Sequence, residues 1–147
     1  MLYAGTDMSL PRKGWDKDAR NLCVESLAEH NAPVAAHFSS PEVQYIGSTS
    51  GCGCDFPHVI LTRGEWIGYP QVDVDDPERE ASERFNREAL VTLLREGGEK
   101  VVELYGIWLS NDGDYTKQAN VRENISLSRI LEPDFRFKER GLYQVSL

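Results

Sequence analysis

The sequence predicts a single α+β domain over residues 1–147, with a mostly antiparallel sheet of about six strands, one long helix packed on a face and a second short helix. Two observations lead to this prediction. The segment after Pro77 has apolar residues at helical spacing, whereas several shorter segments alternate apolar and polar residues with a period of two. Helices and strands also do not alternate regularly along the chain, which disfavours a parallel sheet built from strand–helix–strand units.

The first part of the chain contains two expected strands and a short helix. Leu2–Ala4 is short and apolar enough for an edge strand. Asn21–Ala28 alternates as a strand does, and within it Cys23 is expected to be a small buried hydrophobe rather than a reactive thiol. Asn31 is expected to cap a short helix from Ala32 to Phe38, because an asparagine side chain can accept hydrogen bonds from the first helical amides.

Two further strands are expected on either side of a glycine-rich loop. They are Val43–Ile46 and His58–Thr62. The apolar residues between Trp66 and Tyr69 are flanked by glycine and proline, which indicates irregular structure held down by aromatic packing. Trp15 lies in an early loop and is expected to act as a lid over the core, because an indole supplies a large apolar area.

The long helix has clear start and stop signals. Asp76 is a suitable N-cap, Pro77 fits the first helical position, and Gly97-Gly98 provides the carboxyl-terminal stop. Between these limits, an apolar stripe at helical spacing comprises Ala81, Phe85, Ala89, Leu90, Leu93 and Leu94. We expect this stripe to pack on the sheet rather than to form a partner-binding face.

The last third of the chain is expected to consist mainly of strands. Lys100–Leu109 is apolar on both faces, which predicts a central strand, and Asn111–Asp114 is a strong turn signal. Ile125–Leu131 fits either a strand or a helical face, and we favour the strand. Phe135–Phe137 and Tyr143–Leu147 have a period of two and flank a charged turn with a glycine, which predicts a hairpin.

Composition restricts the classes of partner. The chain has 24 acidic and 16 basic residues and a net charge of −8, which repels nucleic acid phosphates and anionic lipid headgroups. We therefore expect neither a nucleic acid nor a membrane as a partner. The amino terminus lacks a secretory signal pattern, so we expect a cytoplasmic protein of bacterial type whose three cysteines are free thiols.

The chemically richest stretch is the loop between Val43 and His58. Its candidate ligand or thiol residues are Ser48, Ser50, Cys52, Cys54, Asp55 and His58. Cys52 and Cys54 are two residues apart, so in an extended backbone both thiols lie on the same side. Two thiolates could bind zinc with Asp55 and His58, or with other ligands from His30, His37 and Cys23. Because the spacing is not Cys-x-x-Cys, we predict no cofactor and keep zinc only as an option.

Three other interpretations of this loop stay open. Cys52 and Cys54 could form a labile disulfide, because a ring closed across one residue is strained, or one thiolate could act as a nucleophile with His58 as its base. The backbone amides of residues 47–53 could also hold an anion, although the Gly-Lys-Ser/Thr ending of a phosphate loop is missing. Alternatively, the loop is a tight structural connection.

Two groups of acidic residues resemble cation sites only loosely. The first comprises Asp73, Asp75 and Asp76. The second comprises Asp112, Asp114 and Glu123, at the first, third and twelfth positions of a calcium loop. Lys117 stands where that loop requires glycine, so we do not predict a calcium site.

The leading functional prediction is a small acidic soluble domain that binds a small ligand or a protein partner with a basic surface. An inhibitor of a basic protein is an example of this class, and its association would weaken with salt. No complete set of acid, base and nucleophile is evident in the sequence. The alternative is a thiol-dependent enzyme, or a redox or metal sensor, that uses the Gly-Cys-Gly-Cys loop with His58.

Overall fold

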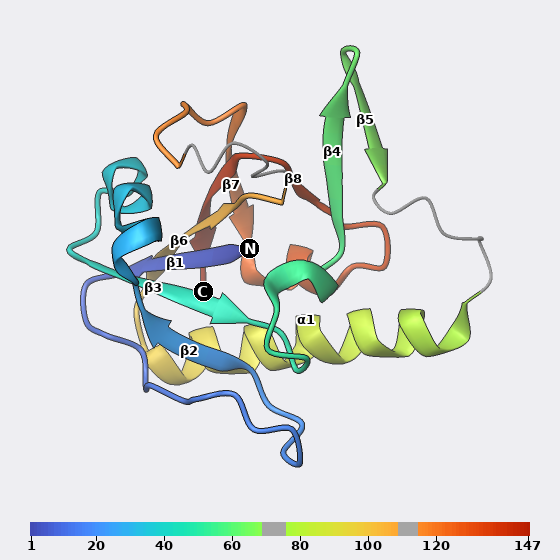
Figure 1. The fold of residues 1–147 in the computed structure, drawn as a ribbon, viewed down its shortest axis with the longest axis horizontal. Coiled ribbons are helices and arrows are strands. Elements are labelled where there is room, and N and C mark those ends of the chain that lie inside the picture. The colour runs from blue at the N-terminus through green and yellow to red at the C-terminus, as the bar shows by residue number, and fades with distance from the viewer. Residues whose placement is uncertain (69–75, 109–114) are drawn as a thin grey trace.

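A computed structural model describes residues 1–68, 76–108 and 115–147, and it confirms the α+β fold (Figure 1). The larger sheet has the order β2 (Cys23–Ser26), β3 (Glu42–Gly47), β1 (Leu2–Thr6), β6 (Val101–Gly106), β9 (Gly141–Ser146) and β7 (Val121–Ser126). The smaller sheet has the order β5 (Glu65–Gly68), β4 (His58–Thr62) and β8 (Phe137–Lys138). Among the described strands, β7 pairs with β9 and β4 with β8 in parallel, and the other pairs are antiparallel.

The centre of the larger sheet is formed by β1 and β6. The prediction of a central strand within Lys100–Leu109 is confirmed for β6, which pairs with β1 on one side and β9 on the other. The prediction that Leu2–Ala4 is an edge strand is wrong, because β1 pairs with both β3 and β6 and all its residues are buried. Its lack of charged residues explains this position, since exposed edges usually carry charges.

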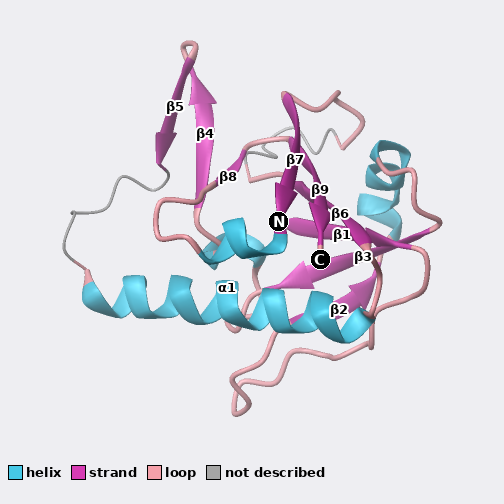
Figure 2. Cartoon of the chain, turned by 180° about the vertical axis from the view of Figure 1, so that it is seen from behind, coloured by secondary structure: helices cyan, strands magenta, loops and turns pink. Residues whose placement is uncertain are grey.

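The long helix α1 (Pro77–Gly97) has the predicted boundaries. The Asp76 Oδ1 atom accepts hydrogen bonds from the amides of Glu78 and Arg79, both at 3.1 Å, and Gly98 follows the helix with φ +72°. Figure 2 shows the helix running along one side of the larger sheet. Its core contacts come from Leu90, Val91 and Leu94, which are buried.

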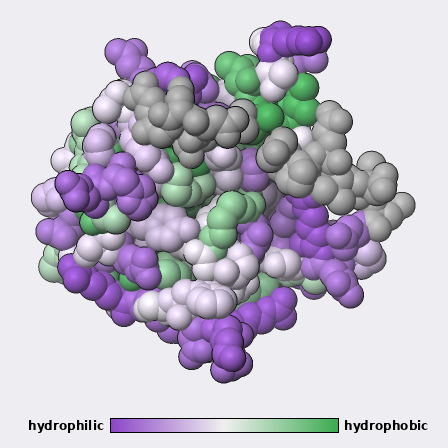
Figure 3. Space-filling model, viewed as in Figure 1, coloured by the Kyte–Doolittle hydropathy of each residue, from purple (hydrophilic) through white to green (hydrophobic). Residues whose placement is uncertain are grey.

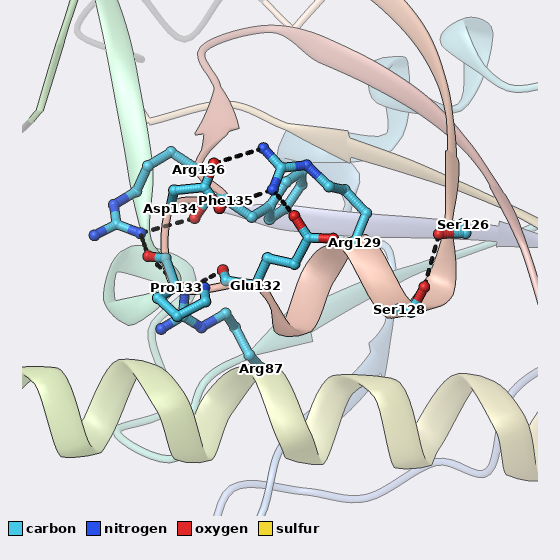
Figure 4. Close-up of polar contacts among 9 residues, drawn as sticks. All are labelled: Arg87, Ser126, Ser128, Arg129, Glu132, Pro133, Asp134, Phe135 and Arg136. Atoms are coloured by element: carbon cyan, nitrogen blue, oxygen red, sulfur yellow. Dashed lines mark hydrogen bonds and ion pairs between the residues drawn. The ribbon is translucent and has the colours of Figure 1, made fainter.

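The segment after β7 is fixed to α1 by polar contacts, which Figure 4 shows in detail. Arg87 of α1 is 5 % exposed, and its Nη1 atom donates to the Glu132 carbonyl at 3.0 Å. On the other side of this segment, Arg129 forms ion pairs with Glu132 and Asp134. The Arg87 contact fixes the chain that follows η3 (Leu127–Leu131) to α1, and the Arg129 ion pairs fix the same chain to η3.

The region predicted as a strand over Ile125–Leu131 contains two kinds of structure. The strand β7 ends at Ser126, and η3 is a 3-10 helix in which Leu127 and Ile130 are buried. The predicted hairpin of Phe135–Phe137 with Tyr143–Leu147 is wrong. Its first arm contributes β8, which pairs with β4 in the smaller sheet, while β9 lies between β6 and β7 in the larger sheet.

Two other local predictions are corrected. The expected helix from Ala32 to Phe38 is the 3-10 helix η1 (Glu29–His37), and Asn31 lies inside it rather than at its N-cap. The irregular structure expected around Trp66 is instead β5, which forms a hairpin with β4. Arg63 and Gly64 have φ values of +53° and +85°, as a tight two-residue turn requires. Figure 3 shows apolar side chains along this hairpin, below a polar tip.

Several predicted features lie outside the described residues. They are the Asn111–Asp114 turn, Leu109, Tyr69, and the acidic residues Asp73, Asp75, Asp112 and Asp114. The predicted strand over Asn21–Ala28 is present but shorter, as β2. Cys23 is 2 % exposed, which confirms its expected burial.

Candidate functional site

We call residues 48–55 the thiol loop. It leaves β3, passes through a short 3-10 turn, η2 (Gly53–Asp55), and continues into β4. Cys52 and Cys54 are joined by a disulfide, so the prediction of free thiols is wrong for this pair, whereas Cys23 is a free thiol. Cys54 is exposed and Cys52 is half-buried, so the disulfide lies at the surface and not in the core.

Seven of the eight backbone amides of the thiol loop donate hydrogen bonds within the protein. Those of residues 48, 49, 50, 51, 52, 53 and 54 each donate a hydrogen bond to another group of the chain. An anion site of the phosphate-loop kind needs amides that are free to donate to the ligand. These hydrogen bonds therefore count against the option of an anion held by the amides of residues 47–53.

Three of the candidate polar residues are brought together beneath the loop. The Ser48 side chain is fully buried, and its Oγ atom donates to Asp55 Oδ2 at 2.8 Å and lies 3.0 Å from Ser50 Oγ. From α1, Asn86 Oδ1 accepts a hydrogen bond from the Thr49 amide at 3.2 Å. These contacts fix the loop from the inside, so Ser48, Ser50 and Asp55 have a structural role here.

Two aromatic side chains hold the loop at Gly53. The Tyr45 hydroxyl accepts from the Gly53 amide at 2.9 Å and donates to the Gly51 carbonyl at 3.2 Å. The Trp108 Nε1 atom donates to the Gly53 carbonyl at 3.0 Å from a position 55 residues away in the chain. Sequence reasoning did not find either residue, because the sequence contains no signal that links them to the loop.

Trp15 covers the outside of the thiol loop. It is 51 % exposed, and its Nε1 atom donates to the Thr49 carbonyl at 3.3 Å. Its ring lies against Gly51, where an added Cβ atom would be 2.9 Å from the indole. The prediction of a lid over the core is therefore wrong, because Trp15 packs on the thiol loop.

His58 is buried at the start of β4, with 7 % of its surface exposed. Its ring is stacked on Trp108 at a centroid distance of 4.5 Å, and its Nδ1 atom lies 2.8 Å from the Phe56 carbonyl. Burial lowers the pKa of His58 to about 4, so the ring is neutral at pH 7. The structure thus gives His58 a packing role under the loop, not the exposed position of a general base that acts on a substrate.

The zinc option lacks ligands in the described part of the chain. Across residues 1–68, 76–108 and 115–147, no three histidine, cysteine or acidic side chains are grouped so that they could hold a metal ion. Asp55 is bound to Ser48, and His37 Nε2 lies 2.7 Å from the Tyr115 carbonyl. Cys23 is buried, and this burial raises the pKa of its thiol to about 11.

The chain matches no protein-family model, no curated protein and no solved structure. Among the described helices, none combines the length and the apolar character that crossing a bilayer requires.

Proposed function

We propose that the protein is a thiol–disulfide switch in which Cys52 and Cys54 are reversibly oxidised. The observation that supports this proposal is the disulfide in an exposed loop whose backbone is fixed by side chains from distant segments. The switch corresponds to the redox sensor named among the sequence-based alternatives. It is favoured over the thiol-dependent enzyme because His58, the expected base of that enzyme, is buried and neutral.

The two sulfur atoms have different surroundings, which assigns them different roles in exchange. Cys54 is the exposed residue, while Cys52 Sγ accepts a hydrogen bond from the Cys54 amide at 3.3 Å. A hydrogen bond to sulfur favours the thiolate, which makes Cys52 the better leaving group. An incoming thiolate therefore attacks Cys54 Sγ, a new S–S bond forms there, and the electron pair of the broken bond stays on Cys52.

A second exchange step completes the cycle. A second external thiol attacks the external sulfur of the mixed disulfide, which releases Cys54 as a thiol and the external pair as a disulfide. The protein gains two electrons and two protons in total, and the two external thiols lose them. In a compartment that keeps thiols reduced, exchange with the thiol pool converts the disulfide to the dithiol, and the disulfide form then reports oxidation.

The proposal is tested by equilibrating the protein with mixtures of reduced and oxidised glutathione. After acid quenching and alkylation, intact mass should show a transition between zero and two modified thiols at Cys52 and Cys54. The buried Cys23 thiol, whose pKa is raised, should react slowly in both states. If an excess of oxidised glutathione leaves both thiols open to alkylation, the proposal is wrong.

The roles of the two cysteines are tested with serine variants. Cys52→Ser should accumulate a glutathione adduct on Cys54, because no neighbouring thiol can resolve the mixed disulfide. Cys54→Ser should form its adduct on Cys52 more slowly, since that residue is half-buried. Cys23→Ser is the matched control and should behave as the unmodified protein does. Equal adduct rates in the first two variants would contradict the assigned polarity.

Binding of a partner with a basic surface, the leading sequence-based prediction, stays a second proposal. The net charge of −8 supports it, and Glu78 and Glu80 are exposed in the first turn of α1. It is tested by measuring association with a lysine-rich peptide at increasing salt. Glu78→Gln and Glu80→Gln together should weaken the association, and an unchanged affinity would count against a site at this helix end.

A further inference from the structure

A groove of about 500 Å³ lies between α1 and the loop that precedes β2. Both views of the chain show this loop descending beside the helix and β2 (Figures 1 and 2). Lys13 forms two backbone hydrogen bonds with Val24 of β2, at 3.0 and 2.7 Å, and these fix the loop side of the groove. The groove is separate from the thiol loop, so this inference goes beyond the proposed switch.

Part of the apolar stripe of α1 lines this groove. Phe85, Ala89 and Leu93 follow one another at helical spacing, line the groove and are only half-buried. Leu90 and Leu94 are buried in the core, as expected for a stripe that packs on the sheet, whereas Ala89 and Leu93 pack against that core and also line the groove. Leu22, from the chain before β2, adds a further apolar side chain to the groove.

The loop side of the groove is positively charged, although the whole chain has a net charge of −8. Arg12, Lys13 and Arg20 line it, and none of the three forms an ion pair within the described residues. The Arg20 guanidinium lies 4.7 Å from the centre of the Phe85 ring, so it contacts the apolar helix wall. Cations beside an apolar wall are complementary to a molecule with an anionic head and an apolar body.

The helix side carries the opposite charge along its outer rim. Glu88 and Glu96 line the groove there, with Thr92 between them on the same helix face. These carboxylates repel an anion from the helix rim and thereby orient it towards the loop. The volume also lies within the range of about 300–1,000 Å³ that is usual for small-molecule sites, which favours a small ligand over a protein segment.

We propose that this groove binds a small amphipathic anion. Its apolar body packs against Phe85, Ala89 and Leu93, and its carboxylate or sulfonate lies beside Arg12 and Lys13. The site requires no metal and no covalent step. The ligand class is defined by the charge on the loop side and by the exposed part of the helix stripe.

The proposal is tested with two fluorescent probes of nearly equal shape. 1-Anilinonaphthalene-8-sulfonate carries a negative charge, and N-phenyl-1-naphthylamine is its uncharged counterpart. The anionic probe should bind the protein with one saturable site and higher affinity than the neutral probe. Decanoate should displace the anionic probe, whereas decyltrimethylammonium should not. Tighter binding of the neutral probe, or displacement by the cationic amphiphile alone, would overturn the proposal.

Two identical substitutions in one loop provide a matched comparison. Lys13 lines the groove, while Lys17 is exposed in the same loop and does not line it. Lys13→Glu should weaken binding of the anionic probe about tenfold, and Lys17→Glu should leave it within about twofold. Ala89→Glu places a carboxylate on the apolar wall and should weaken the binding of both probes. Equal affinities of the two lysine variants for the anionic probe would refute a charge-selective groove.

Discussion

Lowering the pH should destabilise the fold through His58. The ring is 7 % exposed and stacked on Trp108, so a proton on it would place a charge in a poorly solvated position. Burial is the largest cause of its lowered pKa, and the positive charges of the amino terminus and Arg79 lower it further. The Phe56 carbonyl and Glu83 act in the opposite direction without cancelling the effect.

The magnitude follows from the difference between the unfolded and folded pKa values. His58 has an ordinary pKa of 6.5 and a folded pKa of about 4. Because the folded pKa is the lower one, protonation favours the unfolded chain. The stabilising contribution is complete above about pH 6.5 and is lost as the pH falls towards 4. At 1.36 kcal/mol per pKa unit, the full effect is about 3 kcal/mol, of which about 2 kcal/mol is lost between pH 7.5 and pH 5.

The assay is urea unfolding of the protein and of His58→Gln at pH 7.5, 6 and 5. Glutamine does not titrate, so the free energy of unfolding should fall about 2 kcal/mol more in the original protein than in the variant. The Met1 amine, whose pKa burial lowers to about 5, is present in both proteins, so its own titration contributes to both pH profiles. An identical pH slope in the two proteins would refute the reasoning. Nuclear magnetic resonance of the His58 ring in the original protein offers an independent check, because the ring should stay neutral at pH 5.

Three smaller changes should lower the free energy of unfolding, each measured with urea at pH 7.5. Gly53→Ala places a Cβ atom 2.8 Å from the backbone of the first residue and should cost about 1–3 kcal/mol, whereas Gly14→Ala, with no atom within 4 Å, should stay within about 0.5 kcal/mol. Asp76→Ala removes two capping hydrogen bonds and should cost about 1 kcal/mol, with no change expected in thiol oxidation. Ser48→Ala leaves the Asp55 carboxylate without its 2.8 Å donor and should cost about 1–3 kcal/mol, so a neutral result would contradict a structural role for this contact.

The long helix was predictable because its signals are local. Asp76, Pro77 and Gly98 each act within one turn of the helix end, and the apolar spacing between them belongs to the same segment. Strand partners depend instead on residues far away in the chain. Leu2–Ala4 and Phe137–Lys138 have the composition of strands, but nothing within them specifies a central position for the first or a parallel partner for the second.

The composition of the thiol loop was enough to find the candidate site in the sequence. The residues that hold the loop in place could not be found in this way. Cys52 and Cys54 are two residues apart, so their proximity was evident before the structure. Asn86 and Trp108 reach the loop from α1 and from just beyond β6, and no local pattern indicates such contacts. His58 has the chemistry of a base, but its burial depends on packing against Trp108, which is not visible in the sequence.

The groove on α1 was missed for a different physical reason. An apolar stripe on a helix indicates burial. Its spacing is the same whether a side chain packs in the core or lines an open groove, so the spacing does not distinguish the two positions. Leu90 and Leu94 are buried in the core, whereas Ala89 and Leu93 pack against the core with one side and line the groove with the other. The distinction depends on the loop before β2, whose path along the helix is set by the pairing of Lys13 with Val24.

The two proposed sites are linked by few contacts, which limits how strongly they can influence each other. Trp15 belongs to the loop that lines the groove, and it donates one hydrogen bond to Thr49 of the thiol loop. Asn86 lies next to Phe85 on α1, and its side chain accepts a hydrogen bond from the amide of Thr49. Each hydrogen bond contributes about 1 kcal/mol net, so these two bonds together supply a coupling free energy of about 2 kcal/mol. Through them, oxidation of Cys52 and Cys54 should change the affinity of the groove by about thirtyfold, and ligand binding must shift the thiol–disulfide equilibrium by the same factor. A larger shift would require the loop before β2 to leave Val24, which would also open the groove itself.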